Sequence, residues 1–448
     1  MEAIHIQHLF RRAGFGLGPQ ELKRFVGKRK EDIVDFLLED AMREQSKLVI
    51  LNEDIPVPNS SMRLPRYESF RAEKDKRGVL ANAWLDLMVA GKGVLREKMA
   101  LFWHHHLPMG GQSFELTKCY LELLREHALG SFRDLIHAVA KTPAMMRYLD
   151  NHHSHKDAPN ENFPRELLEL FTLGVGHYTL QDVKEAARAF TGWRYNHDTN
   201  VFYFDRSAHD EGIKTFLGRS GRFTGEDIID IVLAQQQCAR HLVRAIYRFF
   251  VDQKEDEDII EYLTDVYYES DYNTAQLLRE IFLSDWFYGN VHINSLVKTP
   301  VELLVGFQRQ TTVKLIGIKT HDQLLWKMGQ RLFAPPNVGG WPSGNQWINT
   351  QTVLYRTCFP IITFAVANRT VPRKSLYYKL HSRIAHSELR SFRYFMDAVY
   401  DRDSMFEQLS ELPCSWSVFF WNMDIEGPEE VHEEGILYYT TSPYYQLN

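Results

Sequence analysis

The segment from Asn160 to Trp193 constrains the fold most, because it predicts two helices joined by a glycine-rich turn (NENFPRELLELFTLGVGHYTLQDVKEAARAFTGW). Pro164 suits the first turn of a helix, where its missing N–H costs nothing. Thr179 followed by Asp182 resembles a capping box with Asp in place of Glu, so the second helix is expected to begin there. The segment therefore predicts a tight helix pair.

The same helical period recurs along most of the chain, and the predicted fold is mainly α, a single large multi-helical domain. We expect this domain to span residues 1–358 and a C-terminal extension, residues 359–448, to pack on the helical body. Residues 48–65 are rich in Pro, Asn and Ser and predict an exposed loop. Two short β-like runs, VFYF and IKTFL, predict at most a small β-ribbon around residues 201–217.

Composition excludes several classes of protein. With 44% hydrophobic and 25% charged residues, the chain has the makeup of an ordinary globular protein. A net charge of -6 argues against a general nucleic-acid binder. No apolar run is long enough to span a bilayer, and the first residues lack the layout of a signal peptide, so we expect no membrane association and a cytoplasmic location. The four cysteines form no CxxC pair, which favours free buried thiols.

The first predicted helix gathers carboxylates on one face. Spacings of three and four residues bring Asn162, Glu166 and Glu169 together. Glu161 and Arg165 form a neighbouring pair at four-residue spacing. Such a set could provide general acid–base groups or metal ligands.

The second predicted helix carries an apolar stripe of Val183, Ala187 and Phe190, with Glu185 and Arg188 on an adjoining face. The alternative to a functional site is a network of ion pairs and caps that fixes the helix pair, because structural networks resemble functional ones in sequence. His177 in the connecting turn adds another polar group. Both interpretations remain open from the sequence.

Histidines outside this segment offer further candidates. In a helix, His104 and His106 point about 200° apart and cannot share one ion, so a metal site there would use one of them or an extended chain. His106 is expected to face the core. His152, His153 and His155 lie in a polar loop (NHHSHKDAPN), for which we expect solvent exposure, with metal capture as an alternative.

The His209–Asp210 pair follows a β-like run, where loops often carry functional residues. Such a pair can orient an imidazole as a base, although adjacent residues seldom pair with each other. Catalytic and turn-forming roles are equally consistent with this position.

Taken together, these residues resemble a bacterial family known as domain of unknown function 1800. The resemblance covers the chain to about residue 356 and rests on HLFRRAGFG, REKMALFWHHHL, ALGSFRDL, YLDN, the whole 160–193 segment, HD with KTFLG, and PPNVGGWPSGNQWIN. The family positions that match are Asn160, Glu161, Asn162, Arg165, Glu166, Glu169, His177, Glu185, Arg188, His209 and Asp210, without assigned roles.

The resemblance also implies a setting. Many relatives look exported, and their genes often lie beside those of a family similar to sulfatases and phosphatases, which implies a partner protein of that kind. This chain departs from the pattern in its expected lack of an export signal and in Pro164.

The leading functional hypothesis is a hydrolase, with or without the assistance of one divalent metal ion. Its catalytic candidates are Glu161, Arg165, Glu166, Glu169, His177, Glu185, Arg188, His209 and Asp210. Its metal candidates are His104 and His106. The alternative is a non-catalytic scaffold or binding module that acts with a partner protein, and the sequence leaves open whether the chain is an enzyme.

Overall fold

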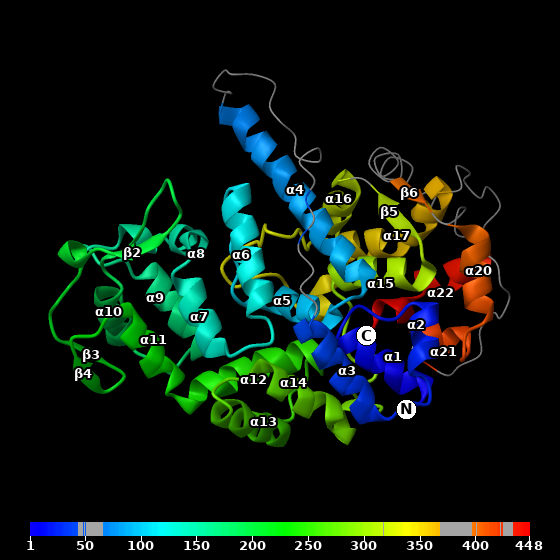
Figure 1. Cartoon of the computed structure of the whole chain (residues 1–448), viewed down its shortest axis with the longest axis horizontal. Coiled ribbons are helices and arrows are strands. Elements are labelled where there is room, and N and C mark those ends of the chain that lie inside the picture. The colour runs from blue at the N-terminus through cyan, green and yellow to red at the C-terminus, as the bar shows by residue number, and fades with distance from the viewer. Residues whose placement is uncertain are drawn as a thin grey trace. The chain divides into compact units, whose positions relative to one another are not determined.

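The computed structural model describes residues 1–43, 48, 50, 66–316, 318–367, 397–399, 401–421, 423 and 433–448. The chain forms two compact units. Unit 1 comprises Met1–Lys98, Phe282–Leu332 and Trp341–Asn448, and unit 2 comprises Met99–Ile281 and Phe333–Gly340. Helices dominate both units, which confirms the mainly α prediction (Figure 1). Apart from residues 48 and 50, the predicted loop at 48–65 lies outside the described residues.

Unit 2 holds the segment around which the sequence is organised. Two helices, α5 (Val94–His106) and α14 (Thr274–Leu283), carry the chain between the units. The other elements of unit 2 are α6 (Phe114–Glu126), α7 (Phe132–Ala140), α8 (Pro143–Tyr148), η2 (Asn151–His153), α9 (Asn162–Glu166), η3 (Leu167–Thr172), α10 (Leu180–Ala189), β1 (Trp193–Tyr195), β2 (Phe202–Phe204), η4 (Arg206–Ala208), β3 (Lys214–Phe216), β4 (Arg219–Gly221), α11 (Gly225–Leu233), α12 (Gln236–Phe250) and α13 (Glu257–Glu269). Within the unit, α12 packs against both α13 and η3, and α10 packs against β3.

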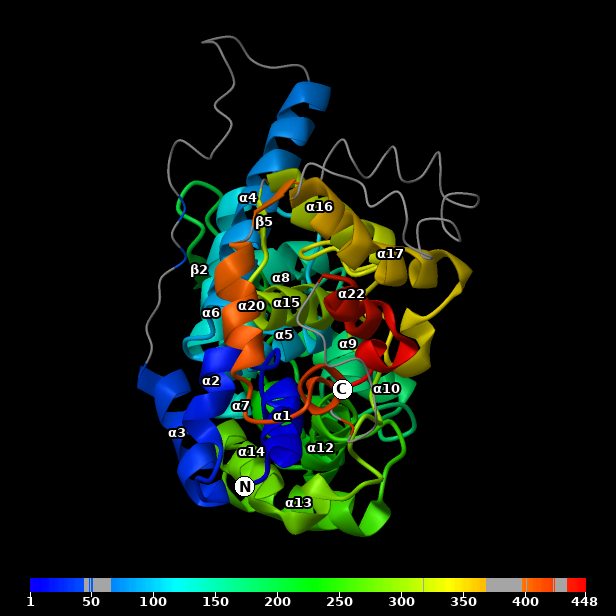
Figure 2. The ribbon, with the colours of Figure 1, turned by 90° about the vertical axis from the view of Figure 1, so that its right-hand side faces the viewer.

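Unit 1 is also helical. Its elements are α1 (Ala3–Arg12), α2 (Pro19–Phe25), α3 (Lys30–Arg43), α4 (Arg66–Ala90), η5 (Asp285–Tyr288), α15 (Pro300–Thr311), β5 (Lys314–Ile316), α16 (Ile318–Met328), η6 (Gly344–Trp347), α17 (Thr350–Ala367), β6 (Asp397–Val399), α20 (Arg402–Ser410), α21 (Trp416–Trp421), α22 (Glu433–Thr441) and η7 (Pro443–Gln446). Helix α17 packs against both α16 and α22 (Figure 2). It runs through the predicted boundary at residue 358 without a break.

The start of α10 follows the predicted capping box. The Asp182 backbone N–H donates to Oγ1 of Thr179 at 3.1 Å, and the Thr179 N–H donates to Oδ2 of Asp182 at 2.8 Å. The predicted stripe of Val183, Ala187 and Phe190 is buried, each residue at most 1% exposed. Local sequence signals therefore fix both the start of this helix and the face that it buries.

The β-structure differs from the prediction of at most one ribbon at 201–217. Strands β2 and β3 lie where strands were expected, but they do not pair with each other: β1 pairs with β2, and β3 pairs with β4. A two-residue turn closes the second hairpin, with positive φ at Leu217 (45°) and Gly218 (77°). Leucine is uncommon at positive φ, so this turn has a weak sequence signal. A third sheet joins β5 to β6, whose residues lie about 80 positions apart.

Two further predictions have outcomes here. The four cysteines are free as expected, but only Cys238 and Cys358 are buried, and Cys119 is exposed. Among the described helices, none combines the length and apolar character that crossing a membrane would need.

Candidate functional site

The first helix of the central segment changes its winding part-way along. It begins as the short α9 and continues as a π-helix, η3. Two imidazoles donate to carbonyls of this π-helix: Nε2 of His241 lies 2.9 Å from the Leu170 oxygen, and Nε2 of His106 lies 3.0 Å from the Phe171 oxygen. π-Helical turns are rare and are often found at functional sites. Side chains from α5 and α12 thus stabilise an unusual backbone conformation.

Two carboxylates lie near the start of this π-helix. Glu166 is the last residue of α9, and Glu169 lies within η3, where its Oε2 accepts a hydrogen bond of 2.8 Å from the Tyr178 hydroxyl. Partial burial and the charge of Glu169 raise the pKa of Glu166, and Arg165 opposes this shift. Burial, followed by the charge of Glu166, also raises the pKa of Tyr148. Glu166 therefore has the environment of a carboxyl group that holds a proton more readily than usual.

The remaining candidates near this turn are more exposed. Arg165 Nη2 lies 2.8 Å from Glu161 Oε2 in an i,i+4 pair whose side chains are 35% and 39% exposed. Such a surface pair contributes little to stability. His177 lies in the turn between η3 and α10 and is exposed. The predicted pair of Glu161 and Arg165 is thus formed, at the N-terminal end of α9.

Glu185, Arg188 and Asp210 form a separate network. Arg188 donates to Asp210 through Nε (2.7 Å) and to Glu185 through Nη1 (2.8 Å). Backbone N–H groups complete it: Thr215 donates to Glu185 at 3.1 Å, and Gly212 donates to Asp210 at 2.8 Å. The Arg188 hydrogen bond holds the pKa of Asp210 below its usual value. The network joins α10 to the β3–β4 hairpin, and the charged groups of its three side chains form hydrogen bonds with one another and with the backbone.

His209 and Asp210 do not act as a dyad in this arrangement. The His209 ring donates from Nδ1 to the Thr191 carbonyl at 2.9 Å and packs edge-on against Phe204. The Asp210 backbone N–H donates to Oγ1 of Thr191, while its carboxylate faces Arg188. Both residues therefore fasten the loop before β3 to the end of α10.

His104 and His106 point in different directions from α5, as the helical spacing predicts. Nε2 of His104 accepts the Phe333 backbone N–H at 3.1 Å, and burial lowers the pKa of His104 to about 3. His106 stacks on Phe102, which confirms its expected place against the core, and burial lowers its pKa to about 3 as well. Both rings are therefore neutral at physiological pH.

A group of three candidate metal ligands occurs elsewhere. Within the part of the chain that the structure describes, Asp150, His152 and His153 form the one such group, and neither His104 nor His106 belongs to it. Metal binding by His104 or His106 stays a prediction.

A family model described as protein of unknown function (DUF1800) matches residues 8–434. The chain belongs to this family. No curated protein and no solved structure matched the chain in the corresponding comparisons. For this DUF1800 member, the match spans both units and the whole polar segment, and it assigns no reaction to them.

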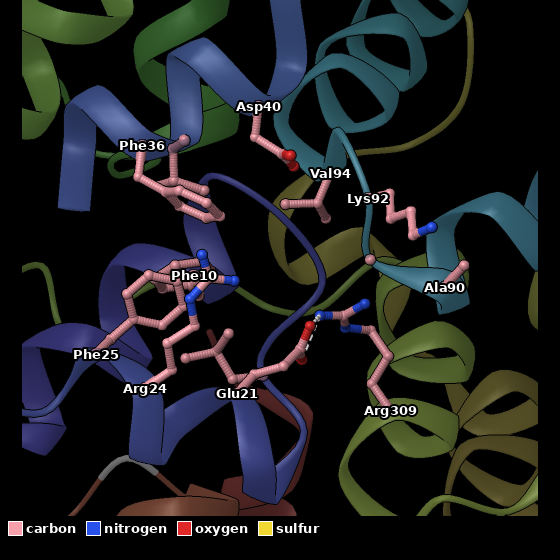
Figure 3. Close-up of a pocket in the computed structure, with 13 residues that line it drawn as sticks. Phe10, Glu21, Arg24, Phe25, Phe36, Asp40, Ala90, Lys92, Val94 and Arg309 are labelled. Atoms are coloured by element: carbon pink, nitrogen blue, oxygen red, sulfur yellow. Dashed lines mark hydrogen bonds and ion pairs between the residues drawn. The ribbon is translucent and has the colours of Figure 1, made fainter. Parts of the chain in front are cut away.

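None of the predicted site residues lines a pocket of about 160 Å³ in unit 1 of this DUF1800 chain (Figure 3). Phe25 and Phe36 line it together with Arg24, whose guanidinium lies 4.6 Å from the centre of the Phe36 ring. Across the pocket, Glu21 and Arg309 form an ion pair at 2.7 Å. These groups come from α2, α3 and α15, so no local motif marks the pocket in the sequence.

Proposed function

We propose that this protein is a hydrolase in which Glu166 transfers a proton and Glu169 is the second carboxylate of the site. The observation that supports the proposal is the placement of these two carboxylates on either side of the start of a π-helical turn that side chains hold in place. A π-helical turn is less favourable than regular α-helix, and a role in positioning the two carboxylates would explain why this turn is kept.

The chemistry follows from the different surroundings of the two carboxylates. Hydrolysis requires a group that protonates the leaving group and a group that positions or deprotonates water. Partial burial beside Glu169 favours the protonated form of Glu166, which suits the first role. The Tyr178 hydroxyl orients Glu169, which suits the second.

Arg165 is the proposed contact for an anionic part of the substrate, because it neighbours Glu166 in the sequence and keeps a partly exposed guanidinium. We assign Glu185, Arg188, His209 and Asp210 the role of positioning α10 and the loop before β3, since their polar atoms bind one another and the backbone.

A second candidate function is a non-catalytic scaffold that acts with a partner protein similar to sulfatases and phosphatases. The Glu185–Arg188–Asp210 network supports this alternative, because charged residues at positions that match the family bind one another there and connect α10 to the β3–β4 hairpin. Under this alternative, the carboxylates at the π-helical turn would have the same structural role.

The test is a comparison of wild type with Glu166→Gln on a panel of chromogenic esters, phosphate esters, sulfate esters and glycosides. We expect wild type to hydrolyse one class and Glu166→Gln to lose about 100-fold or more of that rate, the usual range for a proton-transfer group. Glu257→Gln is the matched control, because it makes the same chemical change at an exposed ion pair with Arg240 that has no part in the proposed site, and it should keep the activity.

Three results would count against the proposal: no hydrolysis of any substrate class by wild type, equal rates for wild type and Glu166→Gln, or equal losses in both variants. An inactive wild type that forms a stable complex with the sulfatase-like neighbour in gel filtration would support the scaffold instead.

A further inference from the structure

Three potential metal ligands converge where α8 ends and η2 begins. Asp150 takes a left-handed conformation (φ 57°) there, which places its carboxylate beside the two histidines that follow. Oδ1 of Asp150 lies 2.7 Å from Nδ1 of His153, and the His152 ring lies beside this pair, with its Nδ1 at 3.9 Å from the same Oδ1. One candidate ligand atom from each residue lies within 4.8 Å of the others.

We propose that Asp150, His152 and His153 bind one divalent transition-metal ion. Two imidazoles and one carboxylate suit zinc, iron or cobalt, whereas magnesium and calcium prefer sites made of oxygen ligands. Three protein ligands leave coordination positions for water, as in metal sites that act on substrates. This inference stands on other residues than the proposed hydrolytic site and does not depend on it.

The surroundings of His152 fit a ligand of this kind. Its Nδ1–H donates to the Met146 carbonyl at 3.0 Å, so its Nε2 carries the lone pair. A metal-bound histidine commonly donates its other N–H to a backbone carbonyl, which fixes the tautomer and the ring orientation. His152 is only 12% exposed, so its position is set before an ion arrives.

His153 and Asp150 are the adjustable members of the group. They form a hydrogen bond of 2.7 Å, which is shorter than the separation of two ligands around a metal. Their side chains are 71% and 53% exposed. A small rotation of either side chain opens the contact, and the exposure of both groups leaves room for it.

Further polar groups surround the proposed site. The centre of the His152 ring lies 3.9 Å from that of the His153 ring and 6.4 Å from that of the His197 ring. The Tyr195 ring lies 5.5 Å from His152, and its buried hydroxyl has no hydrogen-bond partner among the residues that the structure describes. The buried amide of Asn151, between two of the proposed ligands, likewise has no partner there. Buried polar groups are nearly always paired, and water on a bound metal ion would supply such partners.

The alternative to a metal site is a solvent-exposed turn whose His153–Asp150 hydrogen bond has no further role. It accounts for the 2.7 Å contact. It does not account for the unpaired Tyr195 hydroxyl and Asn151 amide near His152.

The experiment uses the full chain, produced without a histidine tag and freed of metal by dialysis against a chelator. Zn²⁺ and Co²⁺ are titrated by calorimetry, and the Co²⁺ complex is examined by visible absorption. We expect one equivalent to bind per chain, with a Co²⁺ spectrum that indicates nitrogen and oxygen ligands. Removing a ligand should cost at least the roughly tenfold loss of affinity that is common for losing a group that only orients a ligand.

The variants are His153→Ala and Asp150→Asn, which change exposed side chains and should leave the fold intact. His152→Ala is the third, although it also removes the hydrogen bond to the Met146 carbonyl. The matched control is His155→Ala, because His155 belongs to the same histidine-rich segment but faces Asp157 instead. It should bind metal as wild type does.

The proposal is overturned if wild type binds no equivalent of Zn²⁺ or Co²⁺ at millimolar concentration. Unchanged affinity in both His153→Ala and Asp150→Asn would also overturn it, as would equal losses in the His155→Ala control. A metal that is lost in His104→Ala and kept in His153→Ala would place the ion at α5 and contradict the site argued for. None of these outcomes depends on finding a substrate, so they separate this inference from the hydrolase proposal.

Discussion

Arg188 and Asp210 form a two-point ion pair, in which Nε lies 2.7 Å from Oδ2 and Nη2 lies 3.3 Å from Oδ1. The pair connects α10 to the loop before β3, and its side chains are 29% and 19% exposed. Two parallel hydrogen bonds between guanidinium and carboxylate are stronger and more directional than a single contact. The pair therefore fixes the hairpin on the helix.

Replacing Arg188 with alanine should destabilise the protein, because Asp210 and Glu185 would lose their cation. We expect the apparent free energy of unfolding in urea to fall by about 2 kcal/mol, as for hydrogen bonds between charged groups that are partly screened by solvent. Arg165→Ala is the control, since its exposed pair with Glu161 should be worth less than about 1 kcal/mol. Equal losses in the two variants would contradict a framework role for Arg188.

Glu166 should respond to pH in the opposite sense from a carboxylate in an ion pair. Its pKa is raised in the folded protein, so its contribution to stability is present below the unfolded pKa and is lost as pH rises through the folded value. Glu166→Gln should therefore be as stable as wild type at pH 4 and at least as stable at pH 7. Thermal denaturation at the two pH values checks this.

The control for that experiment is Glu185→Gln. Glu185 is 8% exposed and accepts hydrogen bonds from Arg188 and the Thr215 N–H, so its neutral substitute should destabilise the protein at pH 7. If Glu166→Gln also lowers the melting temperature at pH 7, Glu166 belongs to the framework and the general-acid role is lost.

Local signals in the sequence predicted much of unit 2. The Thr179–Asp182 box and the stripe that includes Val183 depend on residues within a few positions of one another, and both are found as expected. The helical spacing of His104 and His106 likewise predicted their divergence. Periodicity and capping are local physics, so a single sequence carries them.

What the sequence did not predict depends on distant partners. Arg188 was one of the catalytic candidates, and only the fold reveals that its guanidinium is bound by Asp210, 22 positions away. The π-helical winding of Leu167–Thr172 depends partly on His241, 71 positions from the carbonyl that it reaches. The convergence of Asp150 with His153 depends on the left-handed conformation of Asp150. Residues other than glycine seldom adopt this conformation, so the sequence carries no clear signal for it.

His104 should make the protein less stable in mild acid. Burial lowers its folded pKa to about 3 from 6.5, so its neutral ring stabilises the fold fully above pH 6.5, and that contribution is lost as pH falls from 6.5 toward 3. At about 1.4 kcal/mol per pH unit, the loss between pH 7.5 and pH 5 is roughly 2 kcal/mol.

The measurement is the urea midpoint of wild type and His104→Asn at several pH values. The variant should be less stable than wild type at pH 7.5, because it lacks the buried ring that accepts the Phe333 N–H. It should lose less stability on acidification, because asparagine does not titrate. His177→Asn, a change at an exposed position, should follow the wild-type curve. Parallel curves for wild type and His104→Asn would mean that His104 is not the buried neutral group described above.

Gly91 and Gly27 should respond differently to alanine although both have left-handed backbones, with φ of 74° and 82°. A Cβ on Gly91 would lie 2.0 Å from Nη1 of Arg309, whereas a Cβ on Gly27 would meet nothing within 4 Å. Arg309 cannot easily withdraw, because Nη1 donates to the Val89 carbonyl and Nη2 to Glu21. Gly27→Ala should cost only the backbone strain of about 1–2 kcal/mol.

Gly91→Ala should cost that strain and also the displaced hydrogen bonds of Arg309, about 3 kcal/mol or more in total. Arg309→Ala removes the atoms that would clash, so adding Gly91→Ala to it should cost no more than the strain alone. Urea denaturation of the two single variants and the double variant measures this coupling. Additive losses would mean that the guanidinium moves aside freely, and then the wall of the pocket that Gly91 and Arg309 share would not be rigid.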